Sequence, residues 1–282
     1  MDLIAEPAAI AAWTARARSG GHRIGFVPTM GALHEGHLDL VHRARAVCDR
    51  VVCSIFVNPL QFNNPEDLER YPRRLDEDRS LLESAGCDAL FAPLKEALFE
   101  EFVPFKYDLH GMDAFWEGPS RPGHFQGVVN VVERLFFHVR PDSAFFGEKD
   151  RQQLAIIRAV AEHDHWPEEI VPCPTVRAPD GLALSSRNLR LNDRERAQAT
   201  VLHEALMAAA KAAFKVSVPR TIEQALGVLA TEPAVVPDYF GIAHPETLEP
   251  LEEWNGLDQA VALVAAQVGP VRLIDNMTLQ RH

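Results

Sequence analysis

The hydrophobic positions of this chain follow two patterns, short continuous runs and longer stretches with helical spacing, which alternate from residue 24 onward. Continuous runs of this length are typical of strands buried on both faces. The runs are IGFV 24–27, VVCSIFV 51–57, DALFAP 88–93, SAFFGE 143–148 and IVPCPTV 170–176. Their alternation with helical stretches predicts β-α-β units and a parallel sheet.

Two of the stretches between these runs carry a clear helical face, because their apolar residues recur three, four and seven positions apart. One face consists of Leu40, Val41, Ala44, Val47 and Cys48, and the other of Val128, Val131, Val132, Leu135, Phe136 and Val139. Helices above and below a parallel sheet give a doubly wound, Rossmann-like α/β fold. Ligands of such folds bind beyond the carboxyl ends of the strands.

After about residue 176 the pattern changes. The alanine-rich stretch 194–215 and a second stretch near 221–230 predict helices, and the strand-like runs DYFGIA, AVALVAA and VRLID follow. Since 282 residues also exceed the size of most single cores, roughly 250 residues, we expect two domains. They are residues 1–175 and a smaller α+β domain of residues 176–282, which closes over the site. Residues 100–120 lack clear periodicity, and this absence predicts that they form a flap or a loop over the site.

Charge and cysteine content narrow the classes of function. The formal net charge of −12 argues against nucleic-acid binding and against attraction to an anionic membrane. The four cysteines have no zinc-site spacing, which predicts reduced thiols. The first 21 residues predict an amphipathic helix rather than a signal peptide, and we find no apolar run of the roughly 18 residues that a membrane span needs. We expect a cytoplasmic protein.

The most informative stretch is PTMGALHEGH, residues 28–37, which follows the first predicted strand. A helix that starts near Gly36 would aim its free backbone N–H groups and its positive end at the sheet edge, where they favour an anion. His34 and His37 can both reach that anion as hydrogen-bond donors. The glycine spacing fits neither GxGxxG nor GxxxxGK[ST], and the histidines are too close for a zinc-protease helix. Two ordinary surface histidines are the alternative.

A second stretch of this kind is FFGEKDRQQL, residues 145–154. Lys149 at the strand end can place a charge on a phosphate, Asp150 can accept from ribose hydroxyls, and Gln152 or Gln153 can bind a polar substrate. A solvated turn is the alternative interpretation.

Two further stretches add polar groups at the expected ligand edge. DGLALSSRN, residues 180–188, offers two hydroxyls and Arg187, although a helix cap would also explain Ser185 and Ser186. SIFVNPLQF, residues 54–62, ends a predicted strand with Asn58 and Gln61, which suit hydroxyls and a carboxylate but could equally be loop caps.

Together these clusters supply two histidines, a lysine and an arginine to one crevice of an acidic protein, which is what a triphosphate with Mg²⁺ needs. No cysteine or serine nucleophile with an adjacent base is evident, so direct in-line attack on phosphorus is favoured. Asp76, Glu77 and Asp78 could hold the metal directly or through water, and a solvated helix face is the alternative. Asp78 is our candidate ligand.

The motifs in this order resemble the pantothenate synthetase (pantoate–β-alanine ligase) family of the HxGH nucleotidylyltransferase superfamily. The matching stretches are PTMGALHEGH (28–37), SIFVNPLQF (54–62), PEDLERYPR (65–73), RPGHFQGV (121–128), FFGEKD with QQL (145–154), DGLALSSRN (180–188) and RLIDN (272–276). The resemblance implies that pantoate reacts with ATP to give pantoyl adenylate and pyrophosphate, and that β-alanine then displaces AMP to give pantothenate. It also implies a homodimer.

The resemblance also implies roles for individual residues. His37 is the assigned proton donor, and His34, His37, Lys149 and Arg187 are the expected catalytic residues. Gln61 and Gln153 would hold pantoate, with Gln61 near β-alanine, and Asn58 and Arg121 would also bind substrate. The expected ATP site consists of Met30, Gly31, Ala32, Leu33, His34, Glu35, Gly36, His37, Gly147, Glu148, Lys149, Asp150, Val176, Leu184, Ser185, Ser186 and Arg187.

Two features depart from the family pattern, namely Arg151 at a position that is usually aromatic and the 100–117 segment, which lacks much of the usual glycine and Tyr-Pro pattern. Two other functions stay open. One is a nucleotidylyltransferase with a different acceptor, which would need further cations. The other is a non-catalytic nucleotide sensor, which would bind ATP without releasing pyrophosphate.

Overall fold

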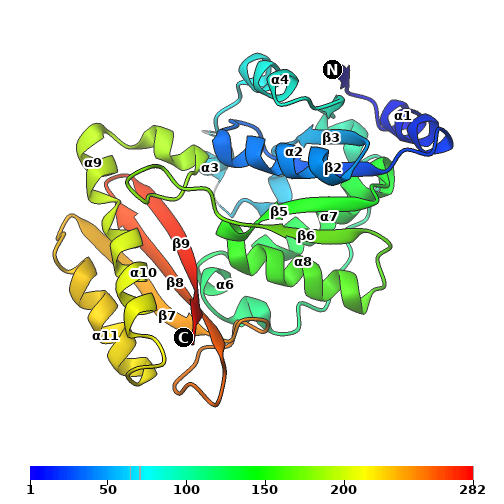
Figure 1. Ribbon diagram of the computed structural model, residues 1–282. Coiled ribbons are helices and arrows are strands. Elements are labelled where there is room, and N and C mark those ends of the chain that lie inside the picture. Colours follow the sequence, from blue (N-terminus) through cyan, green and yellow to red (C-terminus); the bar gives the residue numbers. More distant parts are fainter. Residues whose placement is uncertain (64, 70, 282) are drawn as a thin grey trace.

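The larger part of the computed structural model is built on a parallel sheet in the order β1-β4-β3-β2-β5-β6 (Figure 1). The structure describes residues 1–63, 65–69 and 71–281. The strands are β1 (Asp2–Ile4), β2 (Ile24–Thr29), β3 (Arg50–Ile55), β4 (Ala89–Phe91), β5 (Ser143–Gly147) and β6 (Glu169–Cys173). All five neighbouring pairs are parallel, which confirms the predicted doubly wound fold.

Helices cover both faces of this sheet. The helices are α1 (Pro7–Ser19), α2 (Glu35–Val47), α3 (Pro65–Glu69), α4 (Leu75–Ser84), α5 (Lys95–Leu98), α6 (Glu117–Ser120), α7 (His124–Val139) and α8 (Arg151–His163). Successive strand residues point to opposite faces. Phe26 therefore packs with α1 and α7, and the next residue, Val27, packs with α2 and α4. The continuous apolar runs are explained by this double burial.

The sequence prediction missed β1. Residues 1–21 are expected to form one helix, but Asp2–Ile4 pair with β4 and the helix begins only at Pro7. Three residues with only intermediate or exposed burial carry no alternating pattern to reveal an edge strand. In the part of the chain that the structure describes, no helix has the length and apolar character that crossing a membrane would require.

The smaller part follows as predicted, helices first and then strands. Its helices are α9 (Asp193–Gln198), α10 (Val201–Ala212) and α11 (Val218–Leu229), and its strands are β7 (Val235–Ala243), β8 (Gln259–Val268) and β9 (Val271–Gln280). The antiparallel sheet β7-β8-β9 packs α10 and α11 on one face around a core of its own. Its other face turns toward α6 and the larger sheet (Figure 1).

The aperiodic segment 100–120 is packed down along α7. The amide of Asn130 pairs with both backbone groups of Phe105 at 2.8 Å, and the amide of Gln126 pairs with both of Tyr107. Tyr107 and Met112 are buried against α7 and α8. These side-chain amides make the hydrogen bonds to the segment's backbone that a neighbouring strand would make in a sheet. The segment includes the short 3-10 turn η2 (Met112–Ala114) and ends at α6, which borders the cavity.

Candidate active site

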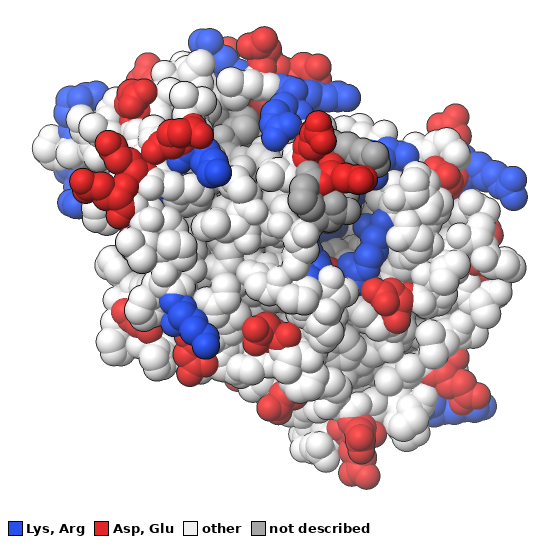
Figure 2. Space-filling view, turned by 180° about the vertical axis from the view of Figure 1, so that it is seen from behind, with Lys and Arg blue, Asp and Glu red and all other residues white. Residues whose placement is uncertain are grey.

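A cavity of about 250 Å³ opens at the carboxyl ends of the strands, between the two sheets. It lies beside β2 and β5, which are the neighbours at which the strand order changes direction. This is the ligand position that the doubly wound fold predicts. Figure 2 shows a hollow in one face of the molecule, with Lys and Arg atoms inside it.

His34 and His37 form a reciprocal cap at the start of α2. The Nδ1 atom of His34 accepts a hydrogen bond from the Gly36 backbone N–H at 3.1 Å, and the Nδ1 atom of His37 accepts from the His34 backbone N–H at 3.3 Å. Because both Nδ1 atoms accept, each neutral ring carries its proton on Nε2. Both side chains line the cavity, so two N–H donors are available there.

The spacing of this motif has a steric reason. The two imidazole rings lie 4.1 Å apart between centroids, and a side chain at Gly36 would begin 2.9 Å from the His34 ring. Burial, and for His37 also the neighbouring His34, lowers the pKa of His34 to about 4 and that of His37 to about 3. Both rings are therefore neutral donors at physiological pH. Neutral N–H donors of this kind suit a phosphate ligand without adding charge to the site.

Four cations border the same cavity. They are Lys149 in the turn η3 (Glu148–Asp150), Arg151 at the start of α8, Arg187 in η4 (Ser186–Arg190) and Arg121, which precedes α7. Arg151 is held by Glu148 and by the Pro245 carbonyl. Burial, with Arg187 nearby, lowers the pKa of Arg121 to about 10. Among the described residues, the guanidinium groups of Arg121 and Arg187 have no hydrogen-bond or ion-pair partner. Unpaired cations in a cavity of an acidic protein favour an anionic ligand.

Asp150 lies beside these cations and, like Glu117 and Asp275, lines the cavity. Its carboxylate lies 3.8 Å from the Lys149 ammonium and borders the cavity. Burial raises the pKa of Asp150, but the charges of Lys149, Arg187 and Arg121 outweigh burial and lower it overall. Asp150 is therefore an acceptor at neutral pH, as a contact to ribose hydroxyls requires.

Asp78, which the sequence predicted to bind the metal, holds a loop instead. This residue is 2% exposed and does not line the cavity. Its carboxylate accepts the backbone N–H groups of Ala32 at 2.8 Å and Leu33 at 2.7 Å. It therefore fixes the loop before α2, in which Gly31 and Ala32 both have positive φ. Asp78 is therefore part of neither the solvated helix face nor the metal site that the sequence offered as alternatives. Within the described residues no group of three or more carboxylate, histidine or cysteine side chains forms a metal site.

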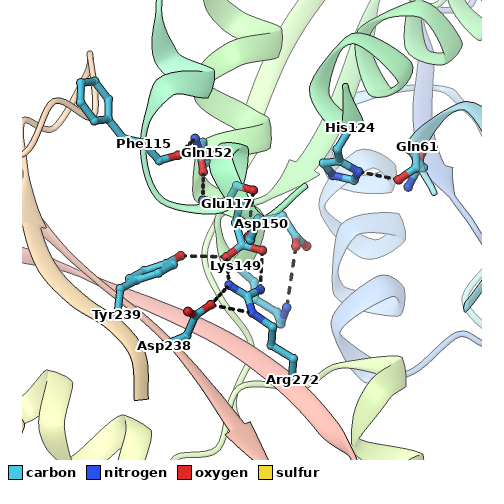
Figure 3. Close-up of polar contacts among 11 residues, drawn as sticks. Gln61, Phe115, Glu117, His124, Lys149, Asp150, Gln152, Asp238, Tyr239 and Arg272 are labelled. Atoms are coloured by element: carbon cyan, nitrogen blue, oxygen red, sulfur yellow. Dashed lines mark hydrogen bonds and ion pairs between the residues drawn. The ribbon is translucent and has the colours of Figure 1, made fainter. Parts of the chain in front are cut away.

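The glutamines of the substrate pocket divide into two roles. The amide of Gln152 donates to the carbonyls of Met112 at 2.7 Å and Phe115 at 2.9 Å and accepts the Glu117 N–H, so it fixes the loop before α6 (Figure 3). Gln153 borders the cavity as Gln152 does, but among the described residues its side-chain amide has no hydrogen-bond partner. The structure thus separates two neighbours that the sequence left as alternatives.

Gln61 is held by its surroundings. Its amide oxygen accepts from Asn58 at 3.1 Å, and its carbonyl accepts from Nδ1 of His124 at 2.8 Å. Asn58 also caps the turn η1 (Pro59–Gln61) through the Leu60 N–H, so its interpretation as a loop cap is correct alongside its place in the pocket. Burial, and the charge of Arg121, lower the pKa of His124 to about 4, which keeps this ring neutral.

Most residues of the expected site meet at the cavity. They are Met30, His34, Gly36, His37, Asn58, Gln61, Arg121, Gly147, Lys149, Asp150, Gln153, Val176, Leu184, Ser185, Ser186 and Arg187. Gly31, Ala32, Leu33, Glu35 and Glu148 do not line it. Ser185 caps η4, as the alternative holds, and the Ser186 hydroxyl donates to the Ala32 carbonyl at 2.9 Å. Arg70, inside the 65–73 motif, lies outside the described residues.

One cluster at the wall of the cavity has no signal in the sequence. Arg272 of β9 donates to both carboxylate oxygens of Glu117 at 2.7 and 2.8 Å, and the Tyr239 hydroxyl donates to the same carboxylate at 3.0 Å (Figure 3). Arg272 also donates to Asp238. This ion pair joins α6 to the smaller sheet. Its partners are 155 residues apart, so no local spacing could reveal it.

Comparison with known proteins gives one consistent result. The family model described as pantoate-beta-alanine ligase matches residues 2–278. A pantothenate synthetase from Rubrobacter xylanophilus is 48% identical, over 98% of both chains. A pantothenate synthetase structure from Thermus thermophilus has a TM-score of 0.92 at 46% identity, with 98% of this chain and 99% of that chain covered. The pantoate-beta-alanine ligase from Francisella tularensis, complexed with beta-gamma ATP and beta-alanine, has a TM-score of 0.78 at 32% identity, over 98% and 97% of the chains.

Proposed function

The chain belongs to the pantoate-β-alanine ligase family, and from this premise we propose how its cavity performs the reaction. The enzyme is a ligase that forms a C–N bond, and it condenses pantoate with β-alanine at the expense of ATP, by way of pantoyl adenylate. The products are pantothenate, AMP and pyrophosphate. The assignment of each step to residues is our proposal.

In the first step a pantoate carboxylate oxygen attacks the α-phosphorus of ATP. The new C–O–P linkage forms while the bond to pyrophosphate breaks, and pyrophosphate leaves with the electron pair. Negative charge therefore shifts to the leaving group. Lys149 and Arg187 offset this charge, and the Nε2–H groups of His34 and His37 donate hydrogen bonds to the phosphate oxygens. Since both rings are neutral, we expect them to polarise the phosphates rather than to bring a full charge.

Pantoate occupies the part of the cavity between Gln61 and Gln153, whose amides suit its hydroxyls and carboxylate. The apolar face of α7, where Val128 and Val132 border the cavity, suits its methyl groups. Arg121 supplies a cation for a carboxylate, either that of pantoate or that of β-alanine. Asn58 acts through Gln61, because its own amide donates to that side chain and to the Gly127 carbonyl.

In the second step the β-alanine amine attacks the carboxyl carbon of the adenylate, AMP leaves with the electrons of the C–O bond, and the amine loses a proton. An acyl adenylate hydrolyses in water, so the cavity has to be covered. We propose that residues 1–175 and 176–282 act as two domains and that the smaller one provides this cover. Support comes from Ile274 and Asn276 of β9 and Tyr239 of β7, which line the cavity.

The proposed cofactor is Mg²⁺, which would enter the site bound to ATP. The ion takes few protein ligands when it is bound to phosphates, usually one or two carboxylates. Asp150 is assigned to the ribose hydroxyls and Asp78 is committed to backbone N–H groups, so the phosphates and water would supply most ligands of the ion. When bound, the ion would neutralise part of the phosphate charge.

A homodimer and a cytoplasmic location are also proposed. The four cysteines are free and buried, which suits a reducing compartment. Sedimentation of the purified protein at several concentrations would test the dimer.

One observation carries the proposal, namely that a single cavity contains the two histidines, the unpaired cations and the two glutamines. The test is mass spectrometry of the products formed from ATP, Mg²⁺, pantoate and β-alanine, with a parallel sample that lacks β-alanine. We expect pantothenate and AMP in the first sample, and retained adenylate with pyrophosphate in the second. Pyrophosphate release that does not depend on pantoate would refute the assigned acceptor.

A further inference from the structure

Strand β9 of the smaller sheet contacts the turn that carries Lys149. The side-chain amide of Asn276 donates two hydrogen bonds, to the carbonyl oxygens of Glu148 and Lys149, each at 2.9 Å. Asn276 is 5% exposed and borders the cavity. The turn η3 has only three residues, and turns of this kind have few hydrogen bonds of their own. Its shape therefore depends on contacts from outside.

Asn276 is in turn held by an ion pair. The Asp275 carboxylate accepts the Asn276 backbone N–H at 2.8 Å and receives two hydrogen bonds from Arg177, at 2.6 and 2.9 Å. Arg177 also donates to the Asn276 carbonyl at 3.0 Å. Asp275 is 4% exposed. A fixed backbone thus presents the Asn276 amide, as a supporting residue of a precise site requires.

Lys149 needs such support. Among the described residues its ammonium has a single ion-pair partner, the Asp150 carboxylate at 3.8 Å, which is beyond hydrogen-bond distance. No side chain therefore fixes its direction. The backbone of η3 determines where Lys149 points.

We infer that Asn276 is a positioning residue for Lys149. The amide clamps the two carbonyls of the turn and so directs the lysine toward the leaving phosphate. Because the clamp comes from the smaller sheet, Lys149 is placed for adenylation only while that sheet is docked on the larger one. This inference rests on the proposed role of Lys149 in the first step.

The test compares Asn276→Asp with Asn276→Ala, because the aspartate keeps the shape but replaces both N–H donors with oxygens that repel the carbonyls. The matched control is Gln280→Glu, which adds the same charge at an exposed position of β9. The rate measured is pyrophosphate release in a single turnover with saturating ATP and pantoate and without β-alanine. A displacement of about 1 Å can cost about 10²-fold in rate, so we expect a loss of roughly 30- to 100-fold for Asn276→Asp and the wild-type rate for the control.

The decisive measurement repeats Asn276→Asp in a Lys149→Ala background. If Asn276 acts through the lysine, Asn276→Asp lowers the rate less than about threefold in the Lys149→Ala background, because the effects of substitutions at interacting residues do not add. An equal loss in both backgrounds would overturn the inference, since Asn276 would then act elsewhere. Wild-type rates for both Asn276 variants, with Lys149→Ala slow, would overturn it and leave the role of Lys149 intact. A wild-type rate for Lys149→Ala would overturn both.

Discussion

The ion pair between Arg272 and Glu117 gives the sharpest prediction about stability, which concerns Arg272→Met. The Glu117 side chain is 7% exposed and accepts two charge-assisted hydrogen bonds from Arg272 and one from Tyr239. Methionine replaces much of the apolar part of the Arg272 side chain, but it leaves the Glu117 carboxylate with Tyr239 as its only side-chain hydrogen-bond donor among the described residues. Removing one partner of a buried pair costs about 3–5 kcal/mol, because a buried charge stays uncompensated.

The assay is thermal unfolding at pH 7, followed by circular dichroism. At about 2 °C per kcal/mol for a chain of this size, the midpoint should fall by roughly 6–10 °C. The control is Arg79→Met, which removes an exposed pair with Glu83 in α4, where the cost is about 0–1 kcal/mol. Equal losses in the two variants would refute the reasoning.

The same variant has a predicted pH dependence. In the wild-type protein burial raises the pKa of Glu117, but the hydrogen bonds and the charge of Arg272 lower it overall. The folded pKa lies below the unfolded one, so the pair contributes stability above the unfolded pKa and loses it as pH falls through the folded pKa. Without Arg272, only the Tyr239 hydrogen bond and the charge of Arg121 oppose burial, so the pKa rises and the carboxyl group accepts a proton more readily. The difference in stability between wild type and Arg272→Met should therefore shrink as pH falls from 7 toward 4, and a constant difference would contradict this account.

The remaining predictions concern ligand binding and acid stability. Asp78→Asn places an amide against two backbone N–H groups and should weaken ATP binding by about tenfold in calorimetry, since one lost charged hydrogen bond is worth about 1.5 kcal/mol or more. The control Glu77→Gln changes an exposed side chain of the same helix and should leave ATP binding unchanged. Gln153→Ala should weaken pantoate binding and keep the affinity for ATP, so an ATP-only defect would reject its role. Burial lowers the pKa of His124 to about 4. Between pH 6.5 and 4 the unfolded chain therefore binds a proton that the folded chain does not, and the free energy of unfolding decreases as the pH is lowered. His124→Gln should flatten this fall by up to about 1.4 kcal/mol per pH unit in urea unfolding at pH 5 and 6, and an unchanged slope would contradict the lowered pKa.

Local features of this protein could be predicted from the sequence because the interactions that produce them span few residues. The reciprocal cap of His34 and His37 involves groups two and three positions apart, so the motif itself contains the hydrogen bonds that start α2 at these histidines. Strand and helix periodicity likewise repeats over a few residues, which is why the doubly wound fold and the later run of helices and strands were predicted correctly.

Contacts between distant parts of the chain are different, because they depend on how the elements pack. The partners of Asp78 are about 45 residues away, those of Asn276 about 127 away and that of Arg272 155 away. Nothing in the sequence around Asp78 distinguishes a loop brace from a metal ligand, and nothing separates Gln152 from Gln153 until α8 is rotated into its place. The sequence determined which chemical groups this protein possesses and the local turns that present them. Packing of the two sheets determined which groups face the cavity, because buried polar groups take the partners that the fold brings within reach.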